Sequence, residues 1–278
     1  MAKPHVQTQV ADLVQALDSA TNVLVLVGAG ISVNAGIPDF RSPTHGIYAK
    51  YNCDPEDVFH IESFRDDPIP LYRLVADLLV DTDGNMLEFT PTVTHKFLRK
   101  LRDSGKLLRV YSQNIDGLDC EPVGLHPDTD VIQCHGNLRT IRCSNCGREQ
   151  PSMTIQSWTL DVVNYLRHQE SSCHAPVSST LQCSRCGGYL KPSVVLFGEQ
   201  LPADFFLKIN RDTQLCDLLI VLGSSLTVFP FAAIPSLLPP GVPQFVVAKH
   251  LTRQPRGAHV ISEDCDVVVT ELSKRFMI

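Results

Sequence analysis

The segment Asn22-Val-Leu-Val-Leu-Val27-Gly28-Ala-Gly-Ile-Ser32 decides the predicted fold. Its uninterrupted apolar run, Val23–Val27, is typical of a parallel strand that is buried on both faces. The run ends in a glycine turn that begins at Gly28, where small residues let backbone N–H groups approach a diphosphate and a following helix N-terminus would favour the negative charge. A simple tight turn is the alternative, because the full G-x-G-x-x-G pattern requires glycine where this chain has Val33.

Other apolar runs recur at wide spacing and extend the same pattern. They lie at 107–111, 194–197, 218–222 and 245–248. Parallel strands need long crossover connections, usually helices. Helices are predicted from apolar periodicity and segment length at 6–17, 92–104, 202–209 and 229–238. The sequence therefore predicts an α/β fold with a mostly parallel sheet covered on both faces.

Two segments interrupt this pattern and predict a second, smaller domain. Residues 42–91 are polar, aromatic and helical in pattern, and residues 138–190 are rich in Ser, Cys and Gln without sheet-core strands. We expect the sheet domain to comprise 1–41, 92–137 and 191–278, and the two inserted modules to form the small domain.

Composition narrows the function classes. Hydrophobic residues make up 44% of the chain, which excludes a disordered protein. The formal net charge of -6 disfavours a protein that binds nucleic acid by neutralising phosphates, so no direct sequence-specific nucleic-acid binding is expected. The apolar runs are too short for a membrane-spanning helix, and no membrane association is expected. No targeting segment is readable, which favours a cytoplasmic or nuclear location.

Two Cys-x-x-Cys pairs predict a metal site. Cys143 and Cys146 form the first pair, Cys183 and Cys186 form the second, and a glycine follows each pair. Four thiolates bind Zn²⁺ without leaving an open coordination position, so the sequence predicts one structural zinc ion. A redox pair is the alternative interpretation of each motif. The long stretch 150–181 between the pairs is predicted to project as an insertion.

Polar side chains follow the predicted strand at 107–111. Gln113, Asn114 and Asp116 come directly after it, at the strand end that lines the ligand crevice of open parallel sheets. An Asn/Asp turn is the alternative. His135 follows another short apolar stretch. Its ordinary pKa near 6.5 suits proton transfer at neutral pH, although a lone histidine is more often structural.

Taken together and in order, these motifs resemble the signatures of the sirtuin family. The resemblance covers roughly residues 22–272 and rests on Gly28-Ala-Gly-Ile-Ser32, Gly36-Ile-Pro-Asp-Phe-Arg41, Gln113-Asn-Ile-Asp116, His135-Gly136, the two cysteine pairs, Phe197-Gly-Glu199, Gly223-Ser-Ser-Leu226 and Cys265-Asp266.

The resemblance implies a fold and an activity. The sheet domain would be Rossmann-like, and the small domain would hold the helical module and the zinc module. The implied reaction removes acetyl or other neutral acyl groups from protein lysines with NAD⁺ as cosubstrate, giving nicotinamide and O-acyl-ADP-ribose. His135 would be the general base, with Asn114 as the other catalytic residue. The implied partners are acyl-lysine proteins or peptides, with histones as one candidate class.

The resemblance also implies a cofactor site. In it, Asp116 would accept a hydrogen bond from the nicotinamide carboxamide, Gln113 would bind the adjacent ribose, and Phe40 would shield the reactive sugar. One departure is Ala248, where sirtuins commonly have an Asn that holds the adenosine ribose, and Lys249 is the candidate replacement. The implied NAD⁺ contacts are Gly28, Ala29, Gly30, Ser32, Ile37, Asp39, Phe40, Arg41, Gln113, Asn114, Ile115, Asp116, Gly223, Ser224, Ser225, Ala248, Lys249 and Cys265.

A peptide site is implied on the segment 191–199. An exposed strand edge there could accept a peptide as an added strand, although the pattern fits an internal sheet strand equally well. Val75 and Leu78 stand where the family branch that removes dicarboxylic acyl groups has Tyr and Arg, which favours neutral acyl groups. The implied peptide contacts are Val194, Val195, Phe197, Gly198, Glu199, Val228 and Phe229.

Two other functions would use the same cofactor site. A mono-ADP-ribosyltransferase needs NAD⁺ but a different acceptor. A non-catalytic NAD⁺-binding module could contact a partner through its zinc insertion, and Ala248 lends this interpretation some support.

Overall fold

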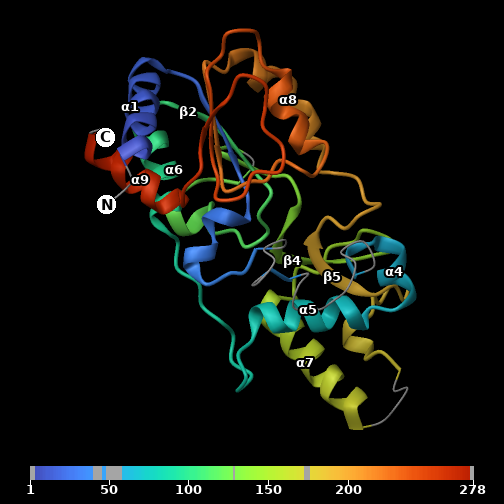
Figure 1. Ribbon diagram of the computed structural model, residues 1–278. Helices are drawn as coiled ribbons and strands as arrows, with labels where there is room; N and C mark the ends of the chain where they lie inside the picture. The colour runs from blue at the N-terminus through green and yellow to red at the C-terminus, as the bar shows by residue number, and fades with distance from the viewer. Residues whose placement is uncertain (1–3, 40–45, 48–57, 128, 172–175, 276–278) are drawn as a thin grey trace. The chain divides into compact units, whose positions relative to one another are not determined.

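The computed structural model describes residues 4–39, 46–47, 58–127, 129–171 and 176–275, without the side chains of 4, 5, 170 and 171. Two compact units divide the chain (Figure 1). The larger unit comprises Met1–Phe40, Phe89–His135 and Leu201–Ile278, and the smaller unit comprises Arg41–Glu88 and Gly136–Gln200.

A six-stranded sheet forms the centre of the larger unit. All its neighbouring strands are parallel, in the order β3-β2-β1-β6-β7-β8. The chain moves outward from β1 in one direction and later returns to its other side, so the topological switch point lies between β1 and β6. The strands are β1 (Val23–Val27), β2 (Leu107–Ser112), β3 (Val131–Gln133), β6 (Leu218–Leu222), β7 (Gln244–Val247) and β8 (His259–Ile261).

Helices cover both faces of this sheet, as its largely apolar strands require. Val23, Val25 and Val27 of β1 belong to the core cluster that includes apolar residues of α1 (Pro4–Ser19), α6 (Val93–Asp103) and α9 (Cys265–Arg275). Leu24 and Leu26 belong to the opposite cluster, which includes apolar residues of α8 (Ala203–Leu215) and η5 (Phe231–Leu237). Because successive side chains of a strand point to opposite faces, β1 contributes to both cores.

The smaller unit joins the two inserted modules around buried aromatic rings. The Trp158 ring lies edge-on to Tyr72, with centroids 5.5 Å apart, and both side chains donate hydrogen bonds to the carbonyl of Leu190. Tyr72 comes from the first module and Trp158 from the second, so the two modules share one core. Its elements are α4 (Ile61–Asp66), α5 (Ile69–Leu79), β4 (Gly136–Cys143), α7 (Ile155–Ser171), η4 (Ser179–Leu181) and β5 (Leu190–Val194).

Two sequence predictions are wrong in this region. The run 194–197 was predicted as a strand of the parallel sheet, but β5 covers Leu190–Val194 and pairs antiparallel with β4 in the smaller unit. Residues 191–200 therefore belong to the smaller unit, and not to the sheet domain as expected. The second insertion contains α7 and most of β4, which pairs with β5 outside the six-stranded sheet, so the expectation of no sheet-core strands in this insertion is confirmed. A short apolar run does not reveal its pairing partner, which tertiary contacts decide.

Two predicted helices differ in type. The segment at 229–238 forms the 3₁₀ helix η5, which contains Pro235, a residue without the N–H that an α-helix interior uses. After Gly28 the chain forms two short 3₁₀ turns, η1 (Ala29–Ile31) and η2 (Val33–Ala35), so the helix N-terminus expected beside the glycine turn is absent from this described stretch.

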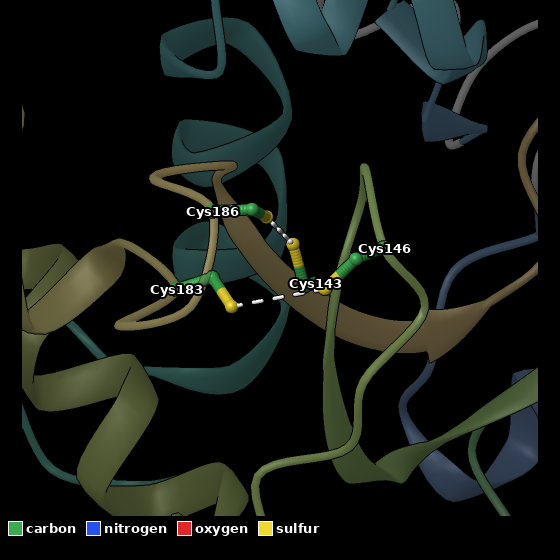
Figure 2. A group of neighbouring side chains, drawn as sticks. All are labelled: Cys143, Cys146, Cys183 and Cys186. Carbon is green, nitrogen blue, oxygen red and sulfur yellow. Dashed lines mark hydrogen bonds between the residues drawn. The ribbon is translucent and has the colours of Figure 1, made fainter.

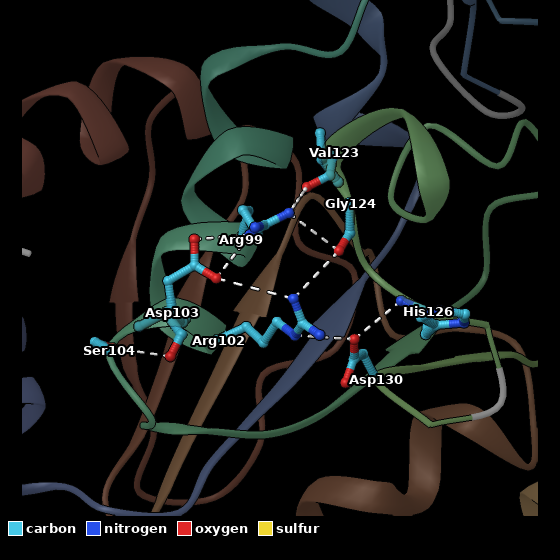
Figure 3. A network of polar contacts seen from close by, with 9 residues as sticks. Arg99, Arg102, Asp103, Ser104, Val123, Gly124, His126 and Asp130 are labelled. Carbon is cyan, nitrogen blue, oxygen red and sulfur yellow. Dashed lines mark hydrogen bonds and ion pairs between the residues drawn. The ribbon is translucent and has the colours of Figure 1, made fainter.

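Two arginines of α6 hold the long connection between β2 and β3 (Figure 3). Arg99 donates to the carboxylate of Asp103 at 2.7 Å and to the carbonyl of Gly124 at 3.2 Å. Arg102 pairs with Asp130 at 3.2 Å. This connection includes η3 (Glu121–Val123) and leads from the end of β2 to β3, so these contacts fix the approach to both strand ends. Within the part of the chain described, no helix combines the length and apolar character that crossing a membrane requires.

Candidate active site at the strand ends

The carboxyl ends of the parallel strands bring the predicted site residues to one edge of the sheet. Gly28 follows β1, Gln113 follows β2, His135 lies two residues beyond β3, Gly223 follows β6 and Ala248 follows β7. Parallel strands end on the same side, so residues from five separate segments converge there. Gly28 and Gly223 flank the topological switch point, where open sheets of this kind bind ligands.

The glycine turn packs directly against the loop after β6. The N–H of Gly28 donates to the carbonyl of Leu222 at 3.0 Å, and the N–H of Gly30 donates to the carbonyl of Gly223 at 2.9 Å. A Cβ atom at Gly30 would lie 2.7 Å from the Cα atom of Gly223. These glycines therefore allow two loops to touch, and the N–H groups of Gly28 and Gly30 donate to the protein's own backbone.

Replacing Gly30 with alanine is expected to destabilise the fold by about 1–3 kcal/mol, because its new methyl group meets backbone that has little room to move. The free energy of unfolding from urea titration measures this. Gly105→Ala is the control, since a new Cβ there meets no atom within 4 Å; its positive φ, which Gly30 does not have, adds only the strain of an alanine in the left-handed region. An equal loss in both variants would refute the packing argument.

A buried hydrogen-bond network fixes Asp116. The Ser32 hydroxyl donates to Asp116 Oδ2 at 2.8 Å and accepts from Asn114 Nδ2 at 3.3 Å. The backbone N–H of Leu118 donates to the other oxygen, Asp116 Oδ1, at 2.9 Å. Ser32 and Asn114 are buried, while Asp116 is half-buried. The structure thus brings together three predicted cofactor residues and holds the carboxylate in one orientation.

His95 completes this network and was missed by the sequence interpretation. Its Nε2 lies 3.5 Å from the Ser32 hydroxyl, and its Nδ1 accepts from the Thr92 N–H at 3.2 Å. Burial lowers the pKa of His95, although the carboxylates of Asp116 and Asp266 oppose this. In the neutral ring Nδ1 accepts, so Nε2 carries the proton and donates to Ser32. The Thr92-x-x-His95 capping box at the start of α6 was the only local signal.

Gln113 connects three of the strand ends. Its N–H donates to the carbonyl of Val27 at 3.0 Å, and its side-chain oxygen accepts from the Ser224 hydroxyl at 2.7 Å. Its own carbonyl lies 3.1 Å from Nδ1 of His135. A carbonyl only accepts, so Nδ1 of His135 carries a proton and the second ring nitrogen, Nε2, is the basic one in the neutral imidazole.

Asp119 is a fully buried acid close to this network. Its Oδ2 atom has no hydrogen-bond partner among the described residues. Burial, reinforced by the negative charge of Asp116, raises the pKa of Asp119 from 3.8 to about 7. The folded chain therefore keeps a proton that the unfolded chain releases between about pH 4 and pH 7. The retained proton stabilises the folded chain. This contribution to the free energy of unfolding is complete below about pH 4 and is lost as the pH rises toward about 7.

Asp119→Asn is expected to flatten the pH dependence of stability, because the amide keeps a neutral side chain at every pH. The gain in unfolding free energy over the unmodified chain should be larger at pH 8 than at pH 5 by at least about 1.4 kcal/mol, the equivalent of one pKa unit. Urea denaturation at both pH values measures it, with the exposed Asp12→Asn as control. A gain of equal size at both pH values would contradict the raised pKa.

The predicted adenosine end of the site comprises Ala248, Lys249 and Cys265. Ala248 is buried and offers no side-chain hydrogen bond, and Lys249 is 56% exposed and pairs with Asp264 at 2.8 Å. Cys265 is buried at the start of α9, where burial raises the pKa of its thiol to about 12. An open cavity of about 650 Å³ beside Lys249 is lined mainly by charged residues of 263–274, and none of the strand-end residues around His135 lines it.

The remaining cofactor residues differ in how far they are described. Ile37 and Asp39 follow the glycine turn and are half-buried, and the Ile37 N–H donates to the carbonyl of Ser32 at 3.3 Å. Ile115 is half-buried beside Asn114, the Ser225 hydroxyl lies 3.1 Å from that of Thr227, and Ala29 begins η1. Phe40 and Arg41, predicted to cover the nucleotide, lie outside the described residues.

The donor set at the strand ends fits a dinucleotide. The strand ends carry the hydroxyl groups of Ser32 and Ser224, the amides of Gln113 and Asn114, and the carboxylate of Asp116, which are chemical groups of the kind that hydrogen-bond ribose and carboxamide. Ala248 is the exception, because the adenosine ribose would lose a side-chain partner there.

The four predicted zinc ligands form one cluster in the smaller unit (Figure 2). The sulfur atoms of Cys143 and Cys186 lie 3.5 Å apart, those of Cys146 and Cys183 lie 3.8 Å apart, and all four are within 4.8 Å of one another. A tetrahedral ion with Zn–S bonds near 2.3 Å spaces its sulfurs by about 3.8 Å. The cluster therefore fits a Zn²⁺ ion with no coordination position left for catalysis.

The predicted peptide-binding residues lie in both units. In the larger unit, Phe229 is 60% exposed with the guanidinium of Arg253 over its ring, and the Val228 carbonyl accepts from Ala232. In the smaller unit, Phe197 is 37% exposed and Gly198 is also exposed. Val195 and Glu199 are half-buried and Val194 is buried.

Comparisons with known proteins agree with this geometry. The Sir2 family model matches residues 28–230. NAD-dependent protein deacetylase HST2 of Candida albicans is 35% identical over 97% of this chain and 77% of its own length. NAD-dependent protein deacetylase sir-2.1 of Caenorhabditis briggsae is 34% identical over 94% of this chain, which spans only 40% of that relative. A solved structure described as Sir2 with deacetylated p53 peptide and 3'-O-acetyl-ADP-ribose has a TM-score of 0.75 at 29% identity, covering 95% of this chain and 97% of its own.

Proposed function

This chain belongs to the Sir2 family, and we propose from that premise that it removes acetyl or other neutral acyl groups from protein lysines with NAD⁺ as cosubstrate. The products would be nicotinamide and O-acyl-ADP-ribose. The observation that carries the proposal is that His135 Nδ1 lies 3.1 Å from the carbonyl oxygen of Gln113, at the sheet edge where the strand ends also hold the fixed carboxylate of Asp116. The names of the similar proteins, which are NAD-dependent protein deacetylases, support it.

His135 is proposed as the general base. Its Nδ1 proton is held by the Gln113 carbonyl, which orients the ring and leaves Nε2 as the basic nitrogen. The half-buried ring keeps access to a reacting group. When bound, NAD⁺ supplies a glycosidic bond whose cleavage releases nicotinamide, and His135 would then accept a proton from a ribose hydroxyl.

Asn114 and Asp116 are proposed to hold the nicotinamide end of the cosubstrate. The Ser32 hydroxyl and the Leu118 N–H fix both oxygens of Asp116, so the carboxylate can accept a carboxamide N–H without reorganising. Asn114 shares the same serine, which makes its side chain part of the same rigid group. Gln113 and Ser224, joined at 2.7 Å, are placed to bind the adjacent ribose.

The proposed substrates are acyl-lysine proteins or peptides, with histones as one candidate class. Val75 is buried and Leu78 half-buried in α5, and neither offers a charged partner for a dicarboxylic acyl group. We also propose a cytoplasmic or nuclear location, because all cysteines among the described residues are free and a reducing compartment preserves thiols.

Incubation with an acetyl-lysine peptide and NAD⁺ tests the proposal. The expected result is nicotinamide release that depends on the peptide and matches the loss of acetyl mass from it. Nicotinamide release with a mass gain on an acceptor protein would instead indicate a mono-ADP-ribosyltransferase. Binding of NAD⁺ without nicotinamide release from any acylated peptide would indicate a non-catalytic module.

A further inference from the structure

A lysine is completely buried in the smaller unit, which is unusual because the charged form is costly to remove from water. Lys191 is 0% exposed, and its ammonium group donates to the Val194 carbonyl at 2.6 Å and to Glu199 Oε2 at 2.9 Å. Both acceptors lie in the segment that follows Lys191 in the chain. The Lys191 side chain therefore binds the chain segment that directly follows it.

Glu199 makes the other half of this arrangement. Its Oε2 atom also accepts from the N–H of Leu196 at 2.9 Å, and its Oε1 atom accepts from Arg142 at 3.2 Å. The Glu199 N–H donates back to the Leu196 carbonyl at 3.0 Å. Lys191 and Glu199 together thus bind the backbone at residues 194 and 196, and Arg142 of β4 holds the carboxylate in place.

The opposite end of the segment is anchored to the helical module. The Phe197 N–H donates to the Phe59 carbonyl at 2.7 Å, and the Phe197 carbonyl accepts from the Ile61 N–H at 2.9 Å. With these bonds the segment 194–199 is held at residues 194 and 196 by Lys191 and Glu199, and at Phe197 by the helical module. The side chain of Phe197 and the backbone of Gly198 stay exposed. The buried polar groups hold the backbone, and the exposed surface is left for a ligand.

An apolar side chain would fill the position of Lys191 at a lower desolvation cost. Replacing a buried ion pair with apolar residues is often neutral or stabilising, so stability alone does not account for a lysine here. The groups that face the ammonium are Glu199, Arg142 and Arg65, and burial lowers the pKa of Lys191 to about 8 although Glu199 raises it. What the ammonium provides, and a methyl group lacks, is two directed hydrogen bonds to one segment.

We propose that Lys191 is a positioning residue that sets the path of segment 194–199 for the acyl-lysine peptide. The inference rests on the proposed function, because it assumes that this segment contacts the substrate. Lys191 itself does not touch the peptide. Its effect should therefore appear in peptide binding and leave the cosubstrate site unchanged.

The test compares Lys191→Met with the unmodified chain in steady-state kinetics. The KM for an acetyl-lysine peptide should rise roughly ten- to hundredfold, as expected when a binding segment shifts by about 1 Å, while kcat and the KM for NAD⁺ stay within about twofold. Partial unfolding would lower the active fraction and hence the apparent kcat, but not raise KM. Lys191→Arg, which keeps a cationic donor, should recover most of the affinity.

Lys208→Met is the matched control, because Lys208 forms an ion pair with Asp204 at 2.6 Å on the surface of α8. It should leave every parameter unchanged. If Lys191→Met does not fold, judged by zinc content and melting, the double variant Lys191→Met/Glu199→Gln replaces it, since the amide keeps an acceptor for Leu196. A peptide KM within twofold of the unmodified value in the folded variant would overturn the proposal.

Hydrogen exchange separates this inference from the proposed function. Loss of the Lys191 bonds should speed exchange of the Leu196 amide, whatever the enzyme does. An unmodified chain without deacylase activity would contradict the proposed function. If the unmodified chain is active, and Lys191→Met leaves both the Leu196 exchange rate and the peptide KM unchanged, only the positioning role of Lys191 is contradicted.

Discussion

His135→Ala is expected to lower kcat for lysine deacylation by about 10²–10⁴-fold, the usual loss when a general base is removed. The fold should survive, because the His135 ring is only half-buried and its Nδ1 donates to a backbone carbonyl, that of Gln113, at the strand ends. Mass spectrometry of the deacylated peptide measures the rate, and thermal melting checks the fold.

His126→Ala is the matched control for this change. His126 lies in the connection that precedes β3, whereas His135 follows β3; the His126 ring is exposed, and its backbone N–H and carbonyl make its bonds to Asp130 and Val131 (Figure 3). It should retain nearly full activity. A His135→Ala variant that kept more than half of the activity would remove His135 from the mechanism.

Cys183→Ser is expected to have the largest effect on stability. The four cysteines form one cluster that fits a single ion, so the loss of one ligand should reduce bound zinc from the expected one per chain to almost none. Structural zinc sites commonly contribute about 10–16 kcal/mol of apparent binding free energy at pH 7, so the smaller unit should unfold without the ion. Metal analysis of the purified protein and near-UV circular dichroism, which senses Trp158, measure both effects.

Cys216→Ser provides the control for that experiment. Cys216 is also a buried free thiol, but it lies next to β6 in the larger unit and outside the cluster. Its replacement should leave the zinc content unchanged. Full zinc occupancy in Cys183→Ser would show that these four cysteines are not the zinc site.

The sequence predicted those features that depend on local pattern. Val23–Val27 and Leu218–Leu222 were predicted as buried strands because each is an uninterrupted apolar run. Both lie in the centre of the sheet, where they pair with each other. The paired cysteine motifs predicted a single cluster because two thiols three residues apart face one ion, and the four sulfurs do converge. Polar residues directly after a strand predicted a site edge, since parallel strands end together.

Features that depend on distant partners could not be predicted. The run 194–197 has the pattern of a sheet strand, but its neighbour β5 pairs with β4, which only the fold selects. The capping box with Thr92 marks His95 as part of a helix start and does not point to the site, because Ser32 lies 63 residues away in the chain. Gly30 was likewise interpreted as part of a diphosphate-binding or simple tight turn, because no sequence pattern shows that two loops touch.

The identity of the small-molecule product tests the central claim most directly. Reaction of the unmodified chain with NAD⁺ and a peptide whose acetyl group carries a heavy isotope should give O-acetyl-ADP-ribose that contains the label, in equal amount to the nicotinamide and the free lysine. Release of the label as acetate from the start of the reaction, with ADP-ribose left unacylated, would contradict the account.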